Sequence, residues 1–211
     1  MNSRPSFLRN NRKKICLICE GFEEFDYVSR LLELGVWSEA YDFTLVNAES
    51  NGNISARYQD SYQSDSYDLV LALCDTDRKP HKDFELICEK INRIFGNDTA
   101  ATEVLIFANP CSMQIELLHF TEIRLRTQNK HKNAAEIERL IGIRNYKASK
   151  EQRARICKLI TKDNYMEMKV RLQKLSPDYS EIPSSNLLVF LQRFESSDAS
   201  WIDEINKKLE G

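Results

Sequence analysis

Apolar residues along this chain form short continuous runs, and each run is followed by a stretch in which apolar positions recur at helical spacing. The clearest runs are residues 15–19 and 69–74, with helical spacing over 22–34 and 83–95 behind them. A continuous apolar run is typical of a strand covered on both faces, and strands that alternate with helices favour a parallel sheet. The pattern predicts an α/β fold with a mostly parallel sheet flanked by helices.

Further segments extend this prediction to residue 126. Residues 43–46 and 104–107 are expected to be strands, and Gly35 and Gly96 stand where the two helices should end. The polar stretch 48–66 contains a glycine and is expected to be a long loop or a weak hairpin. A mostly apolar helix is expected over 111–126.

Beyond residue 126 the alternation of strands and helices ceases. Helical spacing predicts helices at 133–141, at 149–160 behind a Ser149 cap, around 165–175, and twice in the tail. We therefore expect a basic N-terminal arm at 1–14, an α/β core at 15–126 and an added helical C-terminal region at 127–211.

Size and composition limit the class of protein. The chain has 211 residues and 42% of them are hydrophobic, which is enough for one ordinary core and a smaller helical appendage. No run reaches membrane-spanning length, and no long apolar segment follows the basic arm as it would in a signal peptide. The expected location is the cytoplasm, without binding to a membrane.

The small net charge of −2 conceals an uneven distribution of charged residues. Residues 15–123 carry 7 basic and 20 acidic side chains, residues 124–174 carry 15 and 5, and the tail at 178–211 is acidic. Such a division suits a protein that holds a cation at one place and a polyanion at another. The alternative is that the surface helices are simply charged.

Acidic residues close the two clearest strands. Glu20 follows the first apolar run, and Asp75 and Asp77 follow the second. If the two strands are parallel neighbours, these carboxylates meet at one edge of the sheet, where α/β proteins bind ligands. Carboxylates are hard oxygen ligands that suit Mg²⁺ or Mn²⁺, and such ions activate water and stabilise a leaving oxygen in phosphodiester hydrolysis. We expect metal ligation or catalysis by these three residues.

Basic residues supply candidate contacts to a nucleic acid. Arg78, Lys79 and Lys82 come directly after the aspartates and are candidates for holding a phosphate near the metal; the alternative is a solvated start of a helix. Contacts to the nucleic-acid backbone, which weaken with salt, are expected from the helical region. The candidates there are Lys130, Lys132, Arg144, Lys147, Lys150, Arg153 and Arg155.

The order of these motifs resembles a known family. Cys19-Glu20-Gly21 ends one strand, Asp75-Thr76-Asp77 ends another, and Asn109-Pro110-Cys111 precedes a helix that reaches Leu117-Leu118-His119-Phe120. Over residues 13–147 this order and spacing are similar to the RloB-like branch of the Toprim proteins. The resemblance implies a Toprim-like sheet, an acidic metal site that includes Glu24 one turn after Glu20, and nucleic-acid cleavage, often beside an ATPase in anti-phage defence.

The chain departs from the family pattern in one helix. Where relatives carry a glutamate and a tryptophan after the Asn-Pro-Cys motif, this chain has Met113 and Ile115. Glu116 in the next turn is a candidate replacement, and His119 is an auxiliary candidate that is more readily explained as a core histidine. The departure raises the prospect of altered or lost activity.

These observations favour three functions. The first is a Mg²⁺- or Mn²⁺-dependent Toprim endonuclease of prokaryotic defence, acting on DNA or transfer RNA. The second is a catalytically weak Toprim-fold module that binds or regulates an ATPase partner. The third is a nucleotide-handling enzyme or a phosphatase that uses the same carboxylates on a small substrate, although no glycine-rich phosphate loop is present to favour a nucleotide enzyme. The sequence leaves the need for a partner, and homodimer formation, open.

Overall fold

The strands form a single sheet in the order that brings the two acidic strand ends together. The computed structural model describes residues 12–76, 79–127 and 129–211. Its five-stranded sheet has the order β2-β1-β3-β4-β5, with the first four strands parallel and the last one antiparallel. The strands are β1 (Lys13–Cys19), β2 (Tyr41–Asn47), β3 (Leu69–Asp75), β4 (Leu105–Asn109) and β5 (Ser184–Ser185). The predicted α/β fold with a mostly parallel sheet is confirmed.

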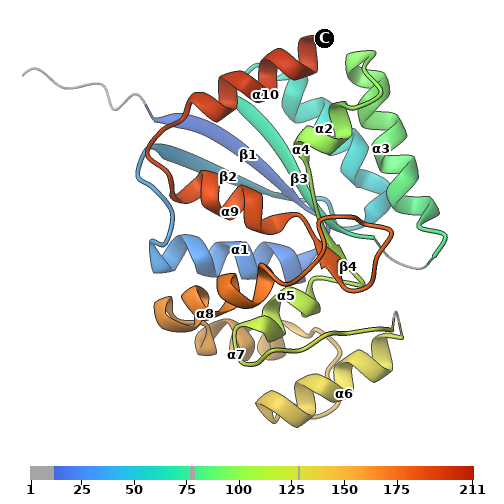
Figure 1. Cartoon of the computed structure of the whole chain (residues 1–211), viewed down its shortest axis with the longest axis vertical. Coiled ribbons are helices and arrows are strands. Elements are labelled where there is room, and N and C mark those ends of the chain that lie inside the picture. Colours follow the sequence, from blue (N-terminus) through green and yellow to red (C-terminus); the bar gives the residue numbers. More distant parts are fainter. Residues whose placement is uncertain (1–11, 77–78, 128) are drawn as a thin grey trace, which may run out of the picture.

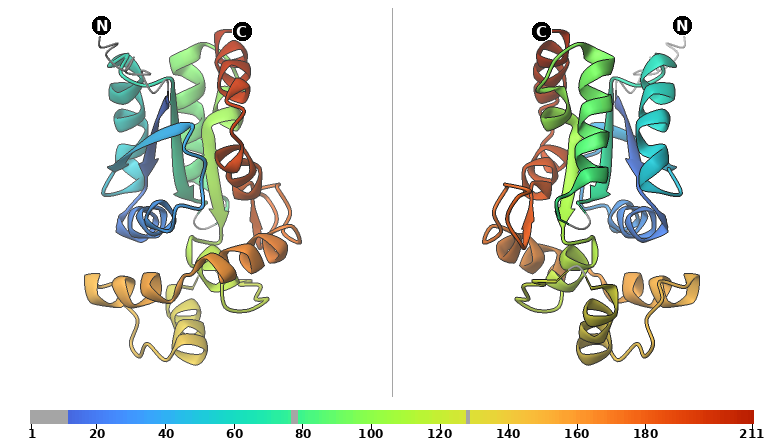
Figure 2. Two further views of the ribbon diagram at one scale, coloured as in Figure 1. Left: turned by 90° about the vertical axis from the view of Figure 1, so that its left-hand side faces the viewer. Right: turned by 90° about the vertical axis from the view of Figure 1, so that its right-hand side faces the viewer.

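Helices cover both faces of the sheet. Figures 1 and 2 show α1 and α9 on one face and α2 and α3 on the other. The helices that surround the sheet are α1 (Phe22–Leu34), α2 (Asn51–Gln63), α3 (Lys82–Phe95), α4 (Ala100–Val104), α5 (Met113–Leu118), α9 (Leu187–Glu195) and α10 (Ser200–Glu210). All seven residues of β3 are buried, as a strand covered on both faces requires. Gly35 and Gly96 adopt the left-handed conformation that ends α1 and α3, as predicted.

The segment 48–66 differs from its prediction. It contains the 13-residue helix α2 instead of a loop or hairpin. Only Ile54, Ser55 and Tyr58 of this helix are buried, so most of its positions are polar and face outward. The apolar stripe is therefore too narrow to have revealed a helix by its spacing.

The predicted apolar helix at 111–126 is also wrong in its length. The helix α5 ends at Leu118, and the chain then turns back. The side-chain amide of Gln114 donates a hydrogen bond to the carbonyl oxygen of Ile123 at 2.9 Å and accepts one from the backbone N–H of Leu125 at 2.7 Å. These bonds hold residues 123–125 alongside α5. The apolar residues of this segment therefore pack against the side of α5 and do not extend the helix.

The C-terminal helices divide between two hydrophobic clusters. Helices α6 (Lys130–Ile141), α7 (Lys150–Leu159) and α8 (Lys162–Leu172) lie at the carboxyl end of the sheet (Figure 1). Ile137, Ile143 and Ile156 pack with Met113 and Leu117 in a cluster of their own. Helices α8, α9 and α10 belong instead to the main core around the sheet. The tail is thus part of the α/β body.

Helix α9 is attached to two strands. The side chain of Asn186 accepts a hydrogen bond from Phe107 N at 2.9 Å and donates one to Leu105 O at 2.8 Å, both on β4. At the other end, the Phe194 ring contacts Trp37 and Phe43 with centroid separations of 4.8 and 5.1 Å. The helix therefore crosses the face of the sheet from β4 to β2.

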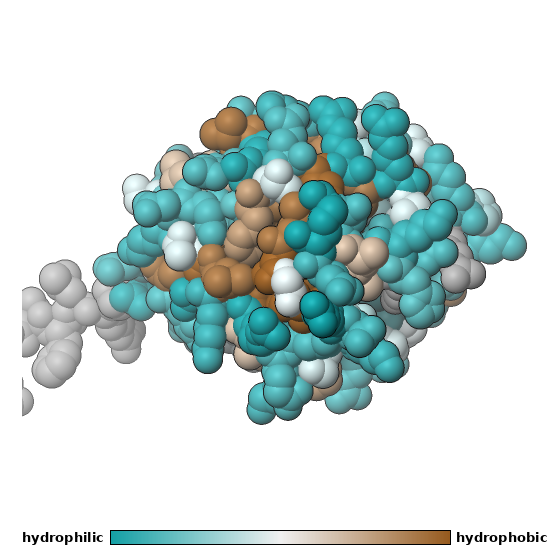
Figure 3. Space-filling view, turned by 90° about the horizontal axis from the view of Figure 1, so that it is seen from below, coloured by the Kyte–Doolittle hydropathy of each residue, from teal (hydrophilic) through white to brown (hydrophobic). Residues whose placement is uncertain are grey.

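The surface at the lower end of the molecule is mixed in character. Seen from below, an apolar area is surrounded by hydrophilic residues (Figure 3). In Figure 1 this end is occupied by α6, α7 and α8, which carry most of the predicted basic region. Within residues 12–76, 79–127 and 129–211, no helix is both long enough and apolar enough to cross a membrane.

Candidate carboxylate site

The central feature of the site is a contact between the ends of two neighbouring strands. Strands β1 and β3 pair in parallel, with Cys19 opposite Leu73, so Glu20 and Asp75 lie at the same edge of the sheet. The backbone N–H of Asp75 donates a hydrogen bond to Oε2 of Glu20 at 2.8 Å. In the sheet, β1 lies between β2 and β3, so the connection from β1 to β2 runs in one direction and the chain then returns past β1 to β3. The carboxyl ends of β1 and β3 are therefore the switch point of the sheet. The predicted meeting of Glu20 and Asp75 is confirmed.

Asp75 is fixed from a third element. Its Oδ1 accepts a hydrogen bond from the backbone N–H of Ser112 at 2.7 Å, just before α5 begins. The side chain is 8% exposed. A backbone N–H that points at a carboxylate orients the group and favours its charged form. Sequence reasoning missed the part played by Ser112, whose only signal was its position before a helix.

Glu24 lies in the first turn of α1 beside the same edge. Its Oε2 accepts a hydrogen bond from the backbone N–H of Gly21 at 2.9 Å, which closes the N-terminus of the helix. The side chain is only 4% exposed. Burial raises the pKa of Glu24, and a hydrogen bond with Ser112 opposes that rise. Ser112 therefore links Glu24 to Asp75.

Two cavities flank these carboxylates. The Asp75 cavity, of about 340 Å³, also contains Glu23, Ser112, Met113 and Lys147 in its wall. Sequence reasoning did not single out Glu23, whose Oε1 accepts a hydrogen bond from the Tyr146 hydroxyl at 2.6 Å.

The second cavity lies on the other side of the strand ends. This Glu20 cavity, of about 510 Å³, is lined by Glu20 together with the start of α2 and one side of α3. Glu20 and Asp75 are thus in contact with each other and line different cavities. A ligand can reach the strand ends from either side.

The donor set has the chemistry that Mg²⁺ or Mn²⁺ requires, since Glu20, Glu24 and Asp75 offer carboxylate oxygens held by backbone N–H groups. In the part of the chain that the structure describes, no group of three or more Asp, Glu, His or Cys side chains is arranged so that it could hold a metal ion. Asp77 and Arg78, both predicted site residues, lie outside the described residues. The described carboxylates alone therefore do not make a metal site, and ligation of Mg²⁺ or Mn²⁺ stays a prediction.

The two auxiliary candidates are buried away from the cavities. Glu116 is 5% exposed, and its Oε2 has no hydrogen-bond partner among the described residues. Burial raises the pKa of Glu116 well above its usual value, and the charges of Glu23 and Glu24 add to this rise. The residues that line the Asp75 cavity include Met113 but not Glu116. The role of Glu116 as a replacement carboxylate stays a prediction.

His119 serves as a connection between helices. Its Nε2 lies 3.0 Å from the hydroxyl of Tyr27 on α1, and its Nδ1 lies 3.1 Å from Oδ1 of Asn164 on α8. Because the amide oxygen accepts only, Nδ1 carries the proton and Nε2 accepts from the tyrosine. Burial lowers the pKa of His119 to about 4. The geometry is that of a neutral core histidine.

The predicted basic residues separate into different environments. Lys147 lines the Asp75 cavity, next to the carboxylates. Arg153 makes a 2.7 Å ion pair with Asp26 and stacks over the ring of Phe22, so its charge is engaged within the protein. Arg144 lies 3.8 Å from Glu138. The remaining described side chains of the set are exposed: Lys79, Lys82, Lys132, Lys150 and Arg155.

Comparison of the chain with protein-family models, with curated proteins and with solved structures found no match in any of the three.

Proposed function

We propose that this protein is a metal-dependent nucleic-acid phosphodiesterase of the Toprim type, with Glu20, Glu24, Asp75 and Asp77 as ligands of Mg²⁺ or Mn²⁺. The observation that carries the proposal is the 2.8 Å hydrogen bond from Asp75 N to Glu20, which joins the ends of the parallel strands β1 and β3. The motif order that resembles the RloB-like Toprim branch supports the same assignment, and cytoplasmic anti-phage defence is the role that this resemblance implies.

Each carboxylate is held in place before any ligand arrives. The backbone N–H of Gly21 binds an oxygen of Glu24, and that of Asp75 binds an oxygen of Glu20. The backbone N–H of Ser112 binds an oxygen of Asp75. Backbone groups of a sheet edge and of helix starts move little, so the carboxylates need no reorganisation during the reaction. When bound, Mg²⁺ or Mn²⁺ supplies polarisation of the phosphoryl oxygen and a lowered pKa for an attacking water.

The chain's own residues have separate tasks in this proposal. Glu20 accepts a proton from the attacking water as the general base, and Asp75 and Glu24 balance positive charge at the strand ends. Lys147, in the wall of the Asp75 cavity, is placed to bind a phosphate oxygen of the substrate. DNA and transfer RNA both present this phosphodiester backbone.

The test compares isosteric variants that remove charge and keep hydrogen bonds. In Asp75→Asn and Glu20→Gln the amide oxygen still accepts the bond from Ser112 or Asp75, while the negative charge is lost. We expect cleavage of plasmid, single-stranded DNA or bulk transfer RNA with Mn²⁺ to fall by about a hundredfold or more in either variant. Titration calorimetry with Mn²⁺ should show weaker binding, which is a readout independent of activity.

The control is Glu39→Gln, because Glu39 is exposed and lies at the far end of β2 from the site. It should retain wild-type cleavage and Mn²⁺ binding. Equal cleavage by wild type and Asp75→Asn would contradict the proposal, as would Mn²⁺ affinity that neither variant lowers.

A second function is favoured by one observation. Met113 places a thioether in the wall of the Asp75 cavity, where the family resemblance implies a carboxylate. A thioether is a poor ligand for a hard cation, so the protein would then be a catalytically weak binding or regulatory module that partners an ATPase. The variant Met113→Glu distinguishes the phosphodiesterase from the binding module. If the wild type is an inert module, the variant should gain Mn²⁺-dependent cleavage. If the wild type already cleaves nucleic acid, the variant should change the cleavage rate little.

A further inference from the structure

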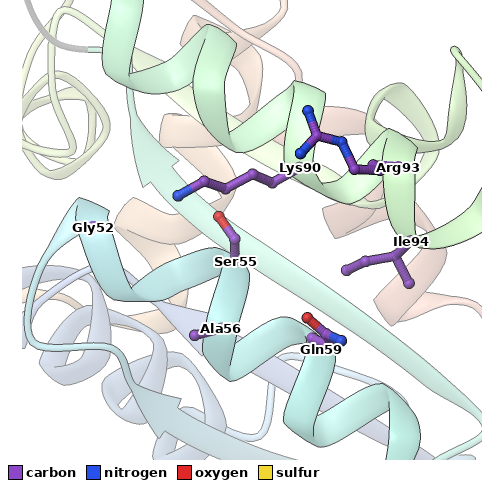
Figure 4. A pocket seen from close by; sticks show the side chains of 7 residues that line it. All are labelled: Gly52, Ser55, Ala56, Gln59, Lys90, Arg93 and Ile94. Carbon is purple, nitrogen blue, oxygen red and sulfur yellow. The ribbon is translucent and has the colours of Figure 1, made fainter.

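A third cavity continues from the Glu20 cavity along the groove between α2 and α3. This Ser55 cavity has a volume of about 400 Å³, and side chains from both helices form its wall (Figure 4). It shares Gly52, Ser55 and Lys90 with the Glu20 cavity, so the two adjoin. We propose that this groove binds a phosphate group, with Ser55, Lys90 and the N-terminus of α2 as its ligands.

Ser55 is the observation that points most directly to a ligand. The residue is 7% exposed, and its Oγ has no hydrogen-bond partner among the described residues. Figure 4 shows the Oγ pointing across the cavity toward the side on which the Lys90 ammonium group lies. A buried hydroxyl without a partner is unfavourable in the free protein, and a phosphate oxygen would satisfy it as an acceptor.

The start of α2 adds a second source of positive potential. The side chain of the N-cap residue Ser50 makes no capping hydrogen bond, and the first turn carries no acidic residue. Gly52, in the first turn, lines both the Ser55 cavity and the Glu20 cavity, so the positive end of this 13-residue helix dipole lies where the two cavities adjoin. Helix N-termini in this arrangement are anion sites.

The charges along the groove separate by sign. Glu20, Glu49 and Asp83 line the Glu20 cavity, whereas the described lining of the Ser55 cavity includes Lys90 and Arg93 but no Asp or Glu. Arg93 is paired with Glu89 at 2.6 Å. Lys90 is exposed, and within the described residues it joins no ion pair. A cation is therefore favoured at one end of the groove, and an anion at Ser55 and Lys90.

The phosphate of a nucleic-acid strand fits this division. A strand that enters over Lys90 would place one phosphate at Ser55 and the next groups of the backbone toward Glu20. The assignment to a strand rests on the proposed function, whereas binding of phosphate itself does not. The same chemistry would also accept inorganic phosphate, and the experiment separates the two sources.

The experiment measures binding by the full-length protein in EDTA, without divalent metal, so a protein that cleaves nothing still gives an answer. Inorganic phosphate is titrated by calorimetry, and a labelled single-stranded oligothymidine by fluorescence anisotropy, with wild type, Ser55→Ala and Lys90→Gln. We expect each variant to weaken oligonucleotide binding, about tenfold for Ser55→Ala at low salt. Lys207→Gln, an exposed lysine on α10, is the matched control and should bind as wild type does.

Thermal unfolding separates this role from a structural one. Ser55→Ala removes a buried hydroxyl that has no partner in the described part of the chain, so its melting temperature should equal or exceed that of the wild type while its affinity falls. Weakened oligonucleotide binding alone supports a strand phosphate, and weakened binding of both ligands supports a general phosphate site. Wild-type affinity in both variants for both ligands would overturn the proposal, whatever the cleavage assay shows.

Discussion

Glu116 is the residue whose environment conflicts most with its charge. It is almost fully buried in α5, its Oε2 has no partner among the described residues, and Glu23 and Glu24 repel its negative form. A group with a raised pKa holds its proton in the native state at pH values where the unfolded chain has released it. The free energy of unfolding therefore falls as the pH rises above the usual value for glutamate.

The variant Glu116→Gln should remove this fall in the free energy of unfolding at high pH. We expect its free energy of unfolding in urea to exceed that of the wild type by about 1 to 3 kcal/mol near pH 8, and the difference to shrink as the pH is lowered toward 4. Glu210→Gln, at the exposed end of α10, should change little at either pH. A Glu116→Gln protein that is less stable than the wild type near pH 8 would mean that the ionised carboxylate is needed.

The acidic strand ends were the part of the site that sequence could predict. Glu20 and Asp75 stand at the ends of apolar runs, and parallel pairing of those runs follows from their pattern. Ser112, Glu23 and Ser55 gave no such signal, because their roles depend on which backbone or cavity they meet after folding. Serine and glutamate at these positions are ordinary surface residues in any one-dimensional pattern.

At the scale of elements, His119 joins α5 to α1 and α8 through Tyr27 and Asn164. With its pKa lowered from 6.5 to about 4, the native state stays neutral where the unfolded chain binds a proton. The contribution of His119 to the free energy of unfolding is therefore complete above pH 6.5, the pKa in the unfolded chain. It is lost as the pH falls from 6.5 to about 4. Protonation would also make Nε2 a donor, so the Tyr27 hydroxyl would have to accept the hydrogen bond that it now donates.

We expect the free energy of unfolding of the wild type to fall by about 3 kcal/mol from this group alone as the pH drops from 6.5 to 4. His119→Gln should lose this contribution and unfold with a flatter pH dependence. His131→Gln, at an exposed position on α6, should keep the wild-type dependence. Parallel curves for wild type and His119→Gln would show that His119 does not titrate in this range.

Element boundaries were predictable where local signals acted alone. The left-handed glycines after α1 and α3 and the Ser149 cap of α7 behave as their sequences indicate. Two elements were not predictable, because tertiary contacts decide them. The polar helix α2 is stabilised by the sheet it covers, and α5 is shortened because Gln114 binds residues 123 and 125. Propensity and spacing carry no information about either contact.

At the scale of the whole molecule, some basic side chains of the helical region form ion pairs within the protein, and others are exposed to solvent. Arg153 pairs with Asp26, whereas Lys150 and Arg155 on α7 are exposed. Only the exposed charges can release counterions from a nucleic acid. Net charge by segment, as counted from sequence, does not distinguish these two kinds.

The double variant Lys150→Gln/Arg155→Gln should bind single-stranded DNA with a weaker salt dependence. We expect the slope of log affinity against log salt to shrink by about 1 to 2, measured by anisotropy in EDTA. Arg153→Gln should instead lower the melting temperature, because it breaks the ion pair with Asp26 and the contact with Phe22. An unchanged slope in the double variant would place the strand elsewhere on the protein.

The position of α9 affects how the chain must be made. Residues 187–195 cross the sheet from β4 to β2, yet they leave the ribosome long after all four parallel strands. Until then, the part of that face that α9 covers, beside α1, stays open to water and to other nascent chains. A product that stops before residue 187 would leave that part of the face exposed permanently, so chaperones and proteases should remove it. Quality control during translation would thus ensure that only chains that include α9 accumulate.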